Sequence, residues 1–390
     1  MQKEIQTREL EKIRDKIMQG CTRCGSCTFF CPVYQETLDE SFVARGKIAL
    51  LRDVMNGAPL LEPGLLEHMD TCLLCRACVE NCPTRVETDR MVLAARADGV
   101  TQKSLSPFEK ILFRNILSRR RTFGRVVRVA SRLQRVLSGS DPSGTIRHLP
   151  HILSGIREGR HIPRISDVFL RDLLPLTTMP PNGVKTIAGV ALFAGCGMEY
   201  LYPQSGMQMV KFLANHGVEV HFPKDQGCCG LPVNARGDLA TAEKMAIQNA
   251  ETFKKYDTVI TGCATCGATL KDYVHRFQPV SGNRRIFESF SGRVVDLNQY
   301  LFDFLSGSDL HLEARKAYHG KKVTWHDPCH LVRYQGIKEQ PRHILKSTSH
   351  IQYVEMPDAD RCCGMGGSFS IHHYDISRKI AWKKARAIRI

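Results

Sequence analysis

Residues 21–32 read CTRCGSCTFFCP, and residues 72–83 repeat the same cysteine spacing in the stretch CLLCRACVENCP. Each stretch has three cysteines at intervals of three residues, and a cysteine followed by proline comes next. Three thiols so close in sequence lie on one tight loop, so their sulfur atoms can all point toward a single binding site. The fourth thiol lies beyond that loop. This repeated pattern decides the fold of the N-terminal part of the chain.

The spacing is typical of bacterial cubane [4Fe-4S] sites, in which the fourth cysteine of each stretch ligates the other cluster. Because crossed ligands hold the two clusters close together, the pair suits one-electron transfer. Zinc is the alternative, but it usually takes two separated cysteine pairs. A helical pattern over residues 43–55 predicts a helical two-cluster ferredoxin domain. The expected ligand sets are Cys21, Cys24, Cys27 and Cys82 for one cluster, and Cys72, Cys75, Cys78 and Cys31 for the other.

The composition indicates a globular protein with an unusual number of cysteines. The 390 residues are 43% hydrophobic and 24% charged, which excludes disordered, collagenous and coiled-coil classes. The chain has sixteen cysteines, all in clusters, but only two tryptophans. Its first residues lack the features of a secretory signal peptide, so we expect a reducing cytoplasm and thiols available for metal. No stretch predicts a membrane helix, so we expect the protein in the cytoplasm, either free or peripheral on the inner face of the cell membrane.

Much of the formal net charge of +16 lies in one segment. Residues 103–171 contain fifteen lysines and arginines against four acidic residues. Such a segment can be a solvated helical linker, or it can bind an acidic protein or anionic lipid. We do not expect nucleic acid as a partner, because no helix-turn-helix, RNA-binding or zinc-finger pattern is present.

The second half of the chain alternates strand and helix patterns, which predicts a parallel α/β sheet. Strands are expected at residues 190–193, 218–222 and 258–261, and helices at residues 205–216 and 239–255. Cysteines follow each of these strands, where α/β sheets place ligand sites. They are Cys196, Cys228, Cys229, Cys263 and Cys266.

The same design begins again near residue 316 with Cys329, Cys362 and Cys363. The distance from the single cysteine to the cysteine pair is 32 positions in the first copy and 33 in the second, which predicts two tandem α/β repeats. The fold class is therefore α/β plus α. We expect a helical ferredoxin domain over residues 1–102, a basic helical linker over 103–184, a first cysteine-rich repeat over 185–315 and a second over 316–390.

The first repeat contains five cysteine thiols, one more than the four that ligate an ordinary cubane cluster. They favour an unusual metal centre or a redox-reactive thiol pair at Cys228 and Cys229, with a vicinal disulfide switch as a further alternative. Flanking glycines, such as Gly195 and Gly230, permit the positive φ angles and close backbone approach that such loops require.

These residues resemble a known family. The stretches GCGMEYLYP at 195–203, QGCCGLPV at 226–233, TGCATCG at 261–267, HDPCHLVR at 326–333 and RCCGMGGSF at 361–369 are similar to the cysteine-rich CCG domain. That domain occurs in glycolate oxidase iron–sulfur subunits, in the iron–sulfur subunits of D-lactate dehydrogenase, and in heterodisulfide reductase. The resemblance implies a non-cubane [4Fe-4S] cluster held by Cys196, Cys228, Cys229, Cys263 and Cys266.

The second repeat departs from this pattern, because the counterparts of Cys263 and Cys266 would fall beyond Ile390. We expect either a shortened polypeptide or an incomplete site. Its three thiols could hold a labile or three-iron cluster or none, with His326 and His330 as hydrogen-bonding neighbours rather than ligands. Asp327 is expected to cap the helix after Cys329.

The chain has no dinucleotide-binding loop, phosphate loop or nucleophile elbow, so we assign no catalytic residue. A partner must then carry out the two-electron chemistry. The resemblance implies an electron-transfer subunit of a glycolate or lactate oxidoreductase. Its partner would be an FAD-containing hydroxy-acid dehydrogenase subunit, and its acceptor a membrane quinone, a membrane subunit or another carrier. One alternative is a heterodisulfide-reductase-like subunit that cleaves a disulfide, and another is a redox-sensing scaffold.

Overall fold

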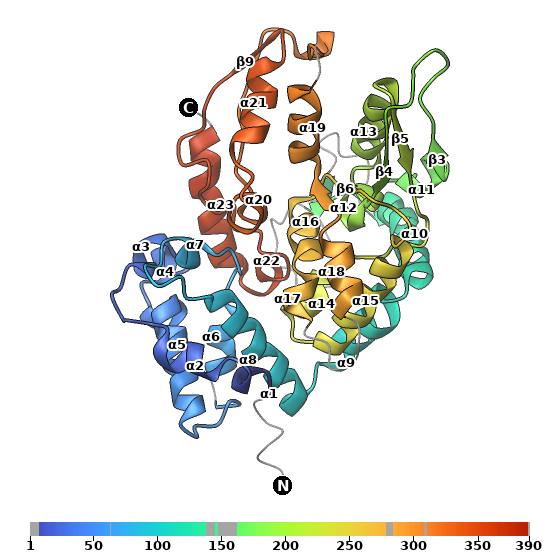
Figure 1. Cartoon of the computed structure of the whole chain (residues 1–390). Helices are drawn as coiled ribbons and strands as arrows, with labels where there is room; N and C mark the ends of the chain where they lie inside the picture. The colour runs from blue at the N-terminus through green and yellow to red at the C-terminus, as the bar shows by residue number, and fades with distance from the viewer. Residues whose placement is uncertain are drawn as a thin grey trace. The chain divides into compact units, whose positions relative to one another are not determined.

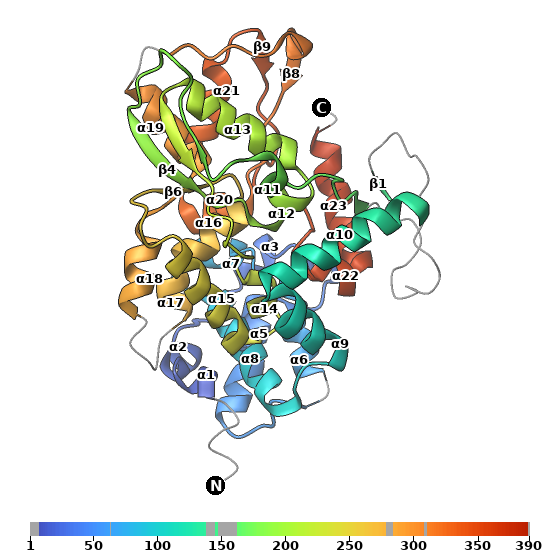
Figure 2. The ribbon, with the colours of Figure 1, turned by 90° about the vertical axis from the view of Figure 1, so that its right-hand side faces the viewer.

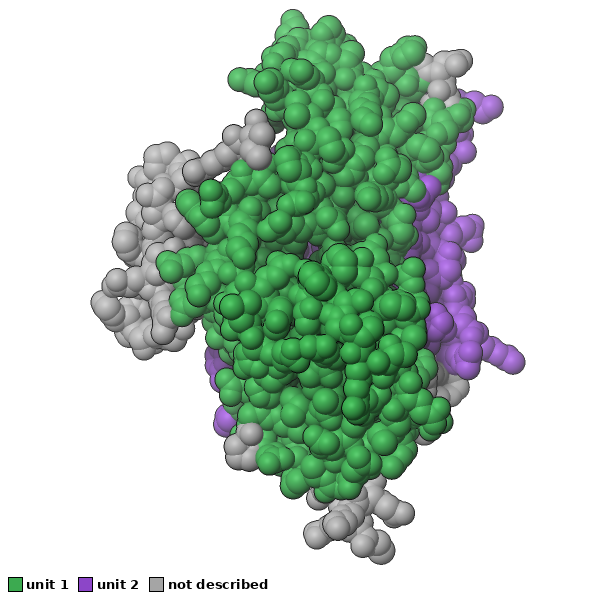
Figure 3. Space-filling view, turned by 90° about the vertical axis from the view of Figure 1, so that its left-hand side faces the viewer, with its two compact units in different colours: residues 1–106, 232–239, 301–390 green, residues 107–231, 240–300 purple. Residues whose placement is uncertain are grey.

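The structure, a computed structural model, describes residues 8–62, 64–137, 145–146, 162–277, 284–307 and 310–388. The chain forms two compact units, which are coloured separately in Figure 3. Unit 1 comprises residues 1–106, 232–239 and 301–390, and unit 2 comprises residues 107–231 and 240–300. Segments that are distant in sequence therefore fold together in unit 1.

The N-terminal part of unit 1 is helical (Figure 1). Its core forms because α5 and α8 each bury apolar residues against the other helices, and Leu51 of α5 and Val92 of α8 are fully buried. The predicted helix at residues 43–55 is α5. The elements are α1 (Arg8–Glu11), α2 (Arg14–Gln19), α3 (Cys27–Phe30), α4 (Tyr34–Thr37), η1 (Glu40–Phe42), α5 (Ala44–Met55), α6 (Leu65–Asp70), α7 (Ala77–Glu80) and α8 (Thr88–Lys103).

In the described residues from 310 onward, unit 1 contains a parallel pair of strands, four α-helices and one 3-10 helix. This part packs on the N-terminal helices through a second buried cluster, in which Phe369 and Ile380 contact Val33 and Leu73. The elements are η4 (Lys316–Tyr318), β8 (Lys321–Val323), α20 (Cys329–Gln335), α21 (Glu339–Ser347), β9 (Ile351–Tyr353), α22 (Phe369–His372) and α23 (Tyr374–Ile388).

Unit 2 is built on a five-stranded sheet in the order β3-β5-β4-β6-β7. Strands β5, β4, β6 and β7 are parallel, and β3 pairs antiparallel with β5 at one edge. The strands are β3 (Thr177–Thr178), β4 (Ala188–Leu192), β5 (Val218–His221), β6 (Val259–Thr261) and β7 (Val294–Asp296).

Helices surround this sheet (Figures 1 and 2). They include α11 (Leu170–Leu173), α12 (Gly195–Tyr200), α13 (Pro203–Asn215), α15 (Leu239–Thr252), α16 (Ala264–Lys271), α17 (Tyr273–Arg276) and α18 (Arg284–Ser291). Two further helices, α14 (Leu231–Ala235) and α19 (Leu297–Ser306), each contain a point where the chain passes from unit 2 to unit 1. The predicted parallel strands and intervening helices are confirmed to within a few residues.

The basic segment belongs to unit 2, where it forms α9 (Pro107–Lys110), the π-helix η2 (Ile111–Leu117), α10 (Arg120–Leu137) and the short pair β1 (Thr145–Ile146) and β2 (Ile162–Pro163). Three of its arginines, Arg147, Arg157 and Arg160, lie outside the described residues. Within the described ranges, no helix combines the length and apolar character needed to cross a membrane. The protein is thus a helix-rich α/β fold.

Candidate metal centres

The two N-terminal cysteine loops have the same unusual backbone. In the first loop, Arg23 and Gly25 have φ angles of 60° and 84°, and in the second, Leu74 and Arg76 have φ angles of 54° and 58°. These residues flank the middle cysteine of each loop. Left-handed conformations cost energy for residues other than glycine and persist where the surrounding structure requires them. The repeated conformation indicates that both loops are shaped to turn three thiols toward one point.

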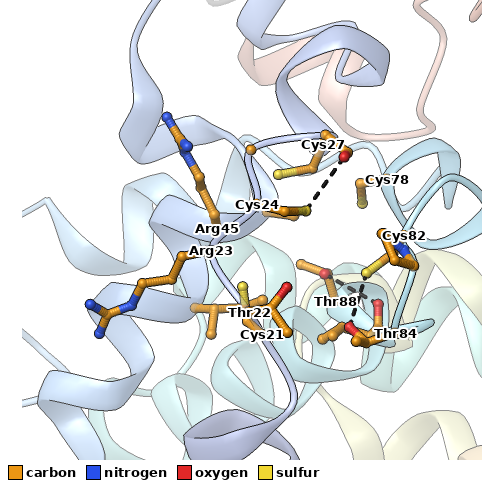
Figure 4. A pocket seen from close by; sticks show the side chains of 16 residues that line it. Cys21, Thr22, Arg23, Cys24, Cys27, Arg45, Cys78, Cys82, Thr84 and Thr88 are labelled. Carbon is orange, nitrogen blue, oxygen red and sulfur yellow. Dashed lines mark hydrogen bonds between the residues drawn. The ribbon is translucent and has the colours of Figure 1, made fainter.

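The first loop opens onto a hollow of about 380 Å³ in unit 1. Figure 4 shows the side chains around it, which come from the loop after α2, from α5 and from the segment that extends from α7 to the start of α8. Hydrogen bonding with Ser26 lowers the pKa of the Cys24 thiol, whereas burial raises the pKa of Cys27. The thiols that line this hollow are Cys21, Cys24, Cys27, Cys78 and Cys82.

A second hollow of about 450 Å³ lies at the other loop. Cys78 lines both hollows, so the two sites are neighbours. Cys82 lines the first hollow and Cys31 lines the second, so each hollow includes the last cysteine of the other stretch. The thiols at the second hollow are Cys31, Cys72, Cys75 and Cys78. Both donor sets consist of cysteine sulfur and fit iron–sulfur clusters, which thiolates hold in proteins.

Two buried cations support the second hollow. Lys47 lines it and is only 2% exposed, and its Nζ donates hydrogen bonds to the carbonyl of His68 and, at 3.2 Å, to Thr71 Oγ1. Burial lowers the pKa of Lys47 to about 8. The guanidinium of Arg96 donates to the carbonyls of Met69 at 2.7 Å and of Cys72 at 2.9 Å. These contacts fix the end of α6 and the start of the cysteine loop, and they place positive charge beside the thiols.

A third set of thiols in unit 1 lies next to the second hollow. Cys329 and Cys362 pack against the buried cluster that contains Cys75. Burial raises the pKa of Cys75 well above its ordinary value, and the sulfurs of Cys362 and Cys329 raise it further. The adjacent Cys363 is exposed. The structure thus brings together the cysteines of the second cysteine-rich segment and places them beside the N-terminal loops.

The polar residues around Cys329 differ in their roles. Nδ1 of His330 lies 3.5 Å from Cys329 Sγ, and Nδ1 of His326 lies 3.1 Å from the carbonyl of Ala359. Asp327 does not cap the following helix, because its two oxygens each accept a 2.8 Å hydrogen bond from Arg342. A buried carboxylate needs such a charged partner more than a helix end needs a cap.

The five thiols of unit 2 meet at the carboxyl ends of three adjacent strands. Cys196 follows β4, Cys228 and Cys229 follow β5, and Cys263 and Cys266 follow β6. Interaction with Cys196 and Cys229 raises the pKa of Cys228, and interaction with Cys229 raises the pKa of Cys266, whereas interaction with Cys228 and Cys266 lowers the pKa of Cys229. A Cβ atom at Gly195 would lie 2.7 Å from Cys266 Sγ, so this close approach requires glycine. The donor set is all sulfur and fits an iron–sulfur centre.

A buried polar network holds the backbone of the paired cysteines. Asn249 accepts a hydrogen bond from the Gly227 N–H and donates one to the carbonyl of Cys228, both at 2.9 Å. The hydroxyl of Tyr273 donates to the carbonyl of Cys229 at 2.8 Å and lies 3.3 Å from the Asn249 amide. Both side chains are almost fully buried. They therefore determine how the two thiols are presented.

A hollow of about 330 Å³ in unit 2 opens onto Cys196 and Cys228. Its wall includes Arg171, whose guanidinium contacts Glu199 Oε1. Glu199 is 3% exposed, its Oε2 has no hydrogen-bond partner among the described residues, and burial raises its pKa. The hollow thus places a buried carboxyl group and an arginine near the thiols of Cys196 and Cys228.

Sequence reasoning missed the residues that support the cysteines. Lys47 stands on the apolar face of α5 between Ala44 and Leu51, and a lysine at such a position is a signal for a buried charge. Arg96 similarly lies among apolar residues of α8. No local sequence pattern predicts that Asn249 or Tyr273 supports the paired cysteines.

Comparison with known proteins agrees with this geometry. The model of the 4Fe-4S dicluster domain matches residues 17–86, and that of the Cysteine-rich domain matches residues 190–271 and 323–390. Lactate utilization protein A of Oceanobacillus iheyensis is 33% identical over 199 residues, which are 51% of this chain and 80% of that protein. The chain belongs to the family of glycolate oxidase and lactate utilization iron–sulfur subunits. The resemblance seen in the sequence is confirmed.

Other members of this iron–sulfur subunit family match almost the whole chain. A probable glycolate oxidase iron–sulfur subunit of Bacillus subtilis is 28% identical over 99% of the chain and 87% of its own length. One of the subunits of a fumarate reductase (CoM/CoB) from Methanothermobacter marburgensis is 28% identical over 96% of the chain, which spans 64% of that protein. Relatives of this chain thus belong to more than one kind of oxidoreductase.

Proposed function

We propose that this chain is the electron-transfer subunit of a flavin-dependent 2-hydroxy-acid oxidoreductase that acts on glycolate or lactate. A partner subunit containing FAD oxidises the hydroxy acid, and this chain passes the electrons on to a quinone or another acceptor. The chain works in the cytoplasm or at the inner face of the cell membrane. The names of its glycolate oxidase and lactate utilization relatives support this assignment.

The observation that carries the proposal is the pair of neighbouring thiol-lined hollows that share Cys78 in their walls. We assign Cys21, Cys24, Cys27 and Cys82 to one cubane [4Fe-4S] cluster and Cys31, Cys72, Cys75 and Cys78 to a second. Clusters held at these thiols supply one-electron redox chemistry. The protein's own part is to hold the two sets as neighbours, because electron transfer between them requires a short distance.

We assign Cys196, Cys228, Cys229, Cys263 and Cys266 to a third, non-cubane [4Fe-4S] cluster. Five sulfur donors at three strand ends support it, together with the backbone network of Asn249 and Tyr273. Cys329, Cys362 and Cys363 are proposed as an incomplete fourth site. We propose the same four-part domain division as above, from 1–102 to 316–390.

The experiment that tests the proposal is anaerobic purification of the tagged chain from its native host, with iron and flavin quantified in the same sample. We expect a flavoprotein to copurify and the complex to reduce a quinone when glycolate or lactate is added. Recovery of an iron-containing protein without flavin, and without activity toward either hydroxy acid, would overturn the proposal.

Disulfide reduction is a second candidate, and the hollow beside Cys196 and Cys228 favours it. Because Cys196 is exposed at this hollow, a disulfide substrate would approach the thiol site directly, whereas a pure electron relay needs no exposed thiol. This candidate predicts that the purified chain, reduced by a low-potential donor, cleaves a disulfide in the absence of any flavoprotein. A failure to consume disulfide under these conditions would remove it.

A further inference from the structure

Helix α10 (Arg120–Leu137), labelled in Figure 2, belongs to unit 2. Its outer face is basic and apolar, and the proposed electron transfer does not use it. The helix contains no acidic residue. Val126, Val129 and Leu133 are 43%, 55% and 54% exposed. They are spaced three and four residues apart, so they form one stripe along the helix.

Contacts within unit 2 fix the rotation of α10 about its axis. On the inner side, Gln134 is 6% exposed and its Oε1 accepts a 3.0 Å hydrogen bond from the N–H of Ile165. Arg128 donates to Asp172 at 2.7 Å and lies over the ring of Phe169 at 4.5 Å. Because these side chains hold the opposite side of the helix, the apolar stripe must face outward.

Three exposed arginines, Arg121, Arg125 and Arg132, accompany the stripe. With 3.6 residues per turn, they form a row directly beside Val126, Val129 and Leu133. Among the residues that the structure describes, Asp172 and Asp225 form ion pairs with this helix, and their partners are other arginines, Arg128 and Arg120. The outer face therefore combines positive charge with exposed aliphatic surface.

We propose that the outer face of α10 docks the protein on an anionic lipid bilayer. A helix lying in the bilayer interface buries its apolar stripe among the acyl chains, while flanking arginines contact the headgroups. Each basic residue near such a surface contributes about 1 kcal/mol. A nucleic acid would offer no apolar surface to the valines and leucine. The same segment also exposes Phe108 at 73% and Ile111 at 54%, which adds aliphatic and aromatic side chains of the kind that enter an interface.

Docking on a lipid bilayer goes beyond the proposed electron transfer, and the binding test below does not depend on whether that proposal holds. The cluster-loaded full-length chain, purified anaerobically, is sedimented with vesicles of phosphatidylcholine alone or mixed with phosphatidylglycerol. We expect it to bind the anionic vesicles, and to do so more weakly at about 0.5 M than at about 0.05 M salt, because salt screens the arginines.

Two double variants separate the contribution of the apolar stripe to vesicle binding from that of the arginines. The Val129→Glu, Leu133→Glu variant should lose binding even at low salt, and Arg125→Gln, Arg132→Gln should weaken binding about 30-fold. The matched controls lie elsewhere on unit 2. Met179→Glu, at a residue 56% exposed, and Lys185→Gln, Lys244→Gln should bind as the unmodified chain does.

Four results would overturn the proposal. The first is an absence of binding to anionic vesicles at low salt. The second is unchanged binding by the Val129→Glu, Leu133→Glu variant, which would show attraction of charge alone. The third is an equal loss in the control variants. The fourth is arginine-dependent binding to an acidic protein, such as a copurifying partner, without vesicle binding, which would make this face a protein-docking surface.

Discussion

The hydroxyl of Tyr334 donates a 2.8 Å hydrogen bond to the carbonyl of Leu74, a residue 260 positions earlier in the chain. Leu74 has the left-handed backbone conformation that shapes the second cysteine loop, and it directly precedes Cys75. The neighbouring Arg333 pairs with Glu80 at 2.8 Å and with Asp360 at 2.9 Å. The C-terminal cysteine-rich segment thus stabilises the conformation of an N-terminal cysteine loop.

The contact predicts a measurable loss of stability in Tyr334→Phe. Removing the hydroxyl leaves the Leu74 carbonyl without this donor, so the free energy of unfolding should fall by about 1 kcal/mol. The midpoint of anaerobic urea unfolding measures this change. Tyr353→Phe is the matched control, because its hydroxyl also donates a hydrogen bond, to Glu355, but at an exposed site. An equally small effect in both variants would contradict the structural role of Tyr334.

The assignment of the first hollow predicts that Cys24→Ser interrupts electron flow. The exposed Cys24 is one of the proposed ligands, so the variant should lose the iron equivalent of one cluster and most acceptor reduction. The flavin of the partner should still be reduced by the hydroxy acid. Stopped-flow absorption of the flavin, together with steady-state quinone reduction, measures both steps.

Ser26→Ala is the control for that variant, because Ser26 contacts Cys24 Sγ at 3.4 Å without being a proposed ligand. It should retain its iron and most of its activity. Unchanged acceptor reduction by Cys24→Ser would show that electrons bypass this site.

The buried charge of Lys47 predicts a shift of reduction potential at the second hollow. Positive charge stabilises the reduced, more negative form of an iron–sulfur centre, so Lys47→Met should lower the potential of that centre. For a unit charge at about 6 Å and an effective dielectric constant of about 20, the shift is on the order of 100 mV. A redox titration followed by electron paramagnetic resonance measures it.

Lys47→Arg keeps the charge and should leave the potential of the second centre nearly unchanged. The potential of the centre at the first hollow should move less in Lys47→Met, because Lys47 lines only the second hollow. Equal shifts at both centres, or none, would show that Lys47 has only a structural role.

The grouping of the cysteines that the structure brings together could largely be predicted from the sequence, because their spacing is local. Three thiols within seven residues identify a loop, and cysteines after Val–Ile-rich runs identify strand ends. The contact between Tyr334 and Leu74 could not be predicted, because no local pattern relates residues so far apart. For the same reason, the sequence does not show that residues 301–390 share a compact unit with residues 1–106.

Asp327 shows how a local rule can fail in this fold. An aspartate before a helix favours a capping role, but Asp327 is 1% exposed and pairs with Arg342. No sequence pattern marks this partner, which lies fifteen residues away on α21. Burial, which depends on the tertiary structure, determined the outcome.

The five-thiol site of unit 2 predicts a specific effect of Tyr273→Phe. Tyr273 is fully buried and donates to the carbonyl of Cys229, so the variant leaves a buried carbonyl without that partner at a cost of about 1–3 kcal/mol. The paired cysteines should become less well positioned, and the spectroscopic signal of this centre should broaden or decline. The signals of the two N-terminal centres should not change. Tyr202→Phe, at a residue 55% exposed, is the control and should leave all signals intact. If Tyr273→Phe preserves the signal of the unit 2 centre while lowering stability, Tyr273 supports the fold but does not position the thiols.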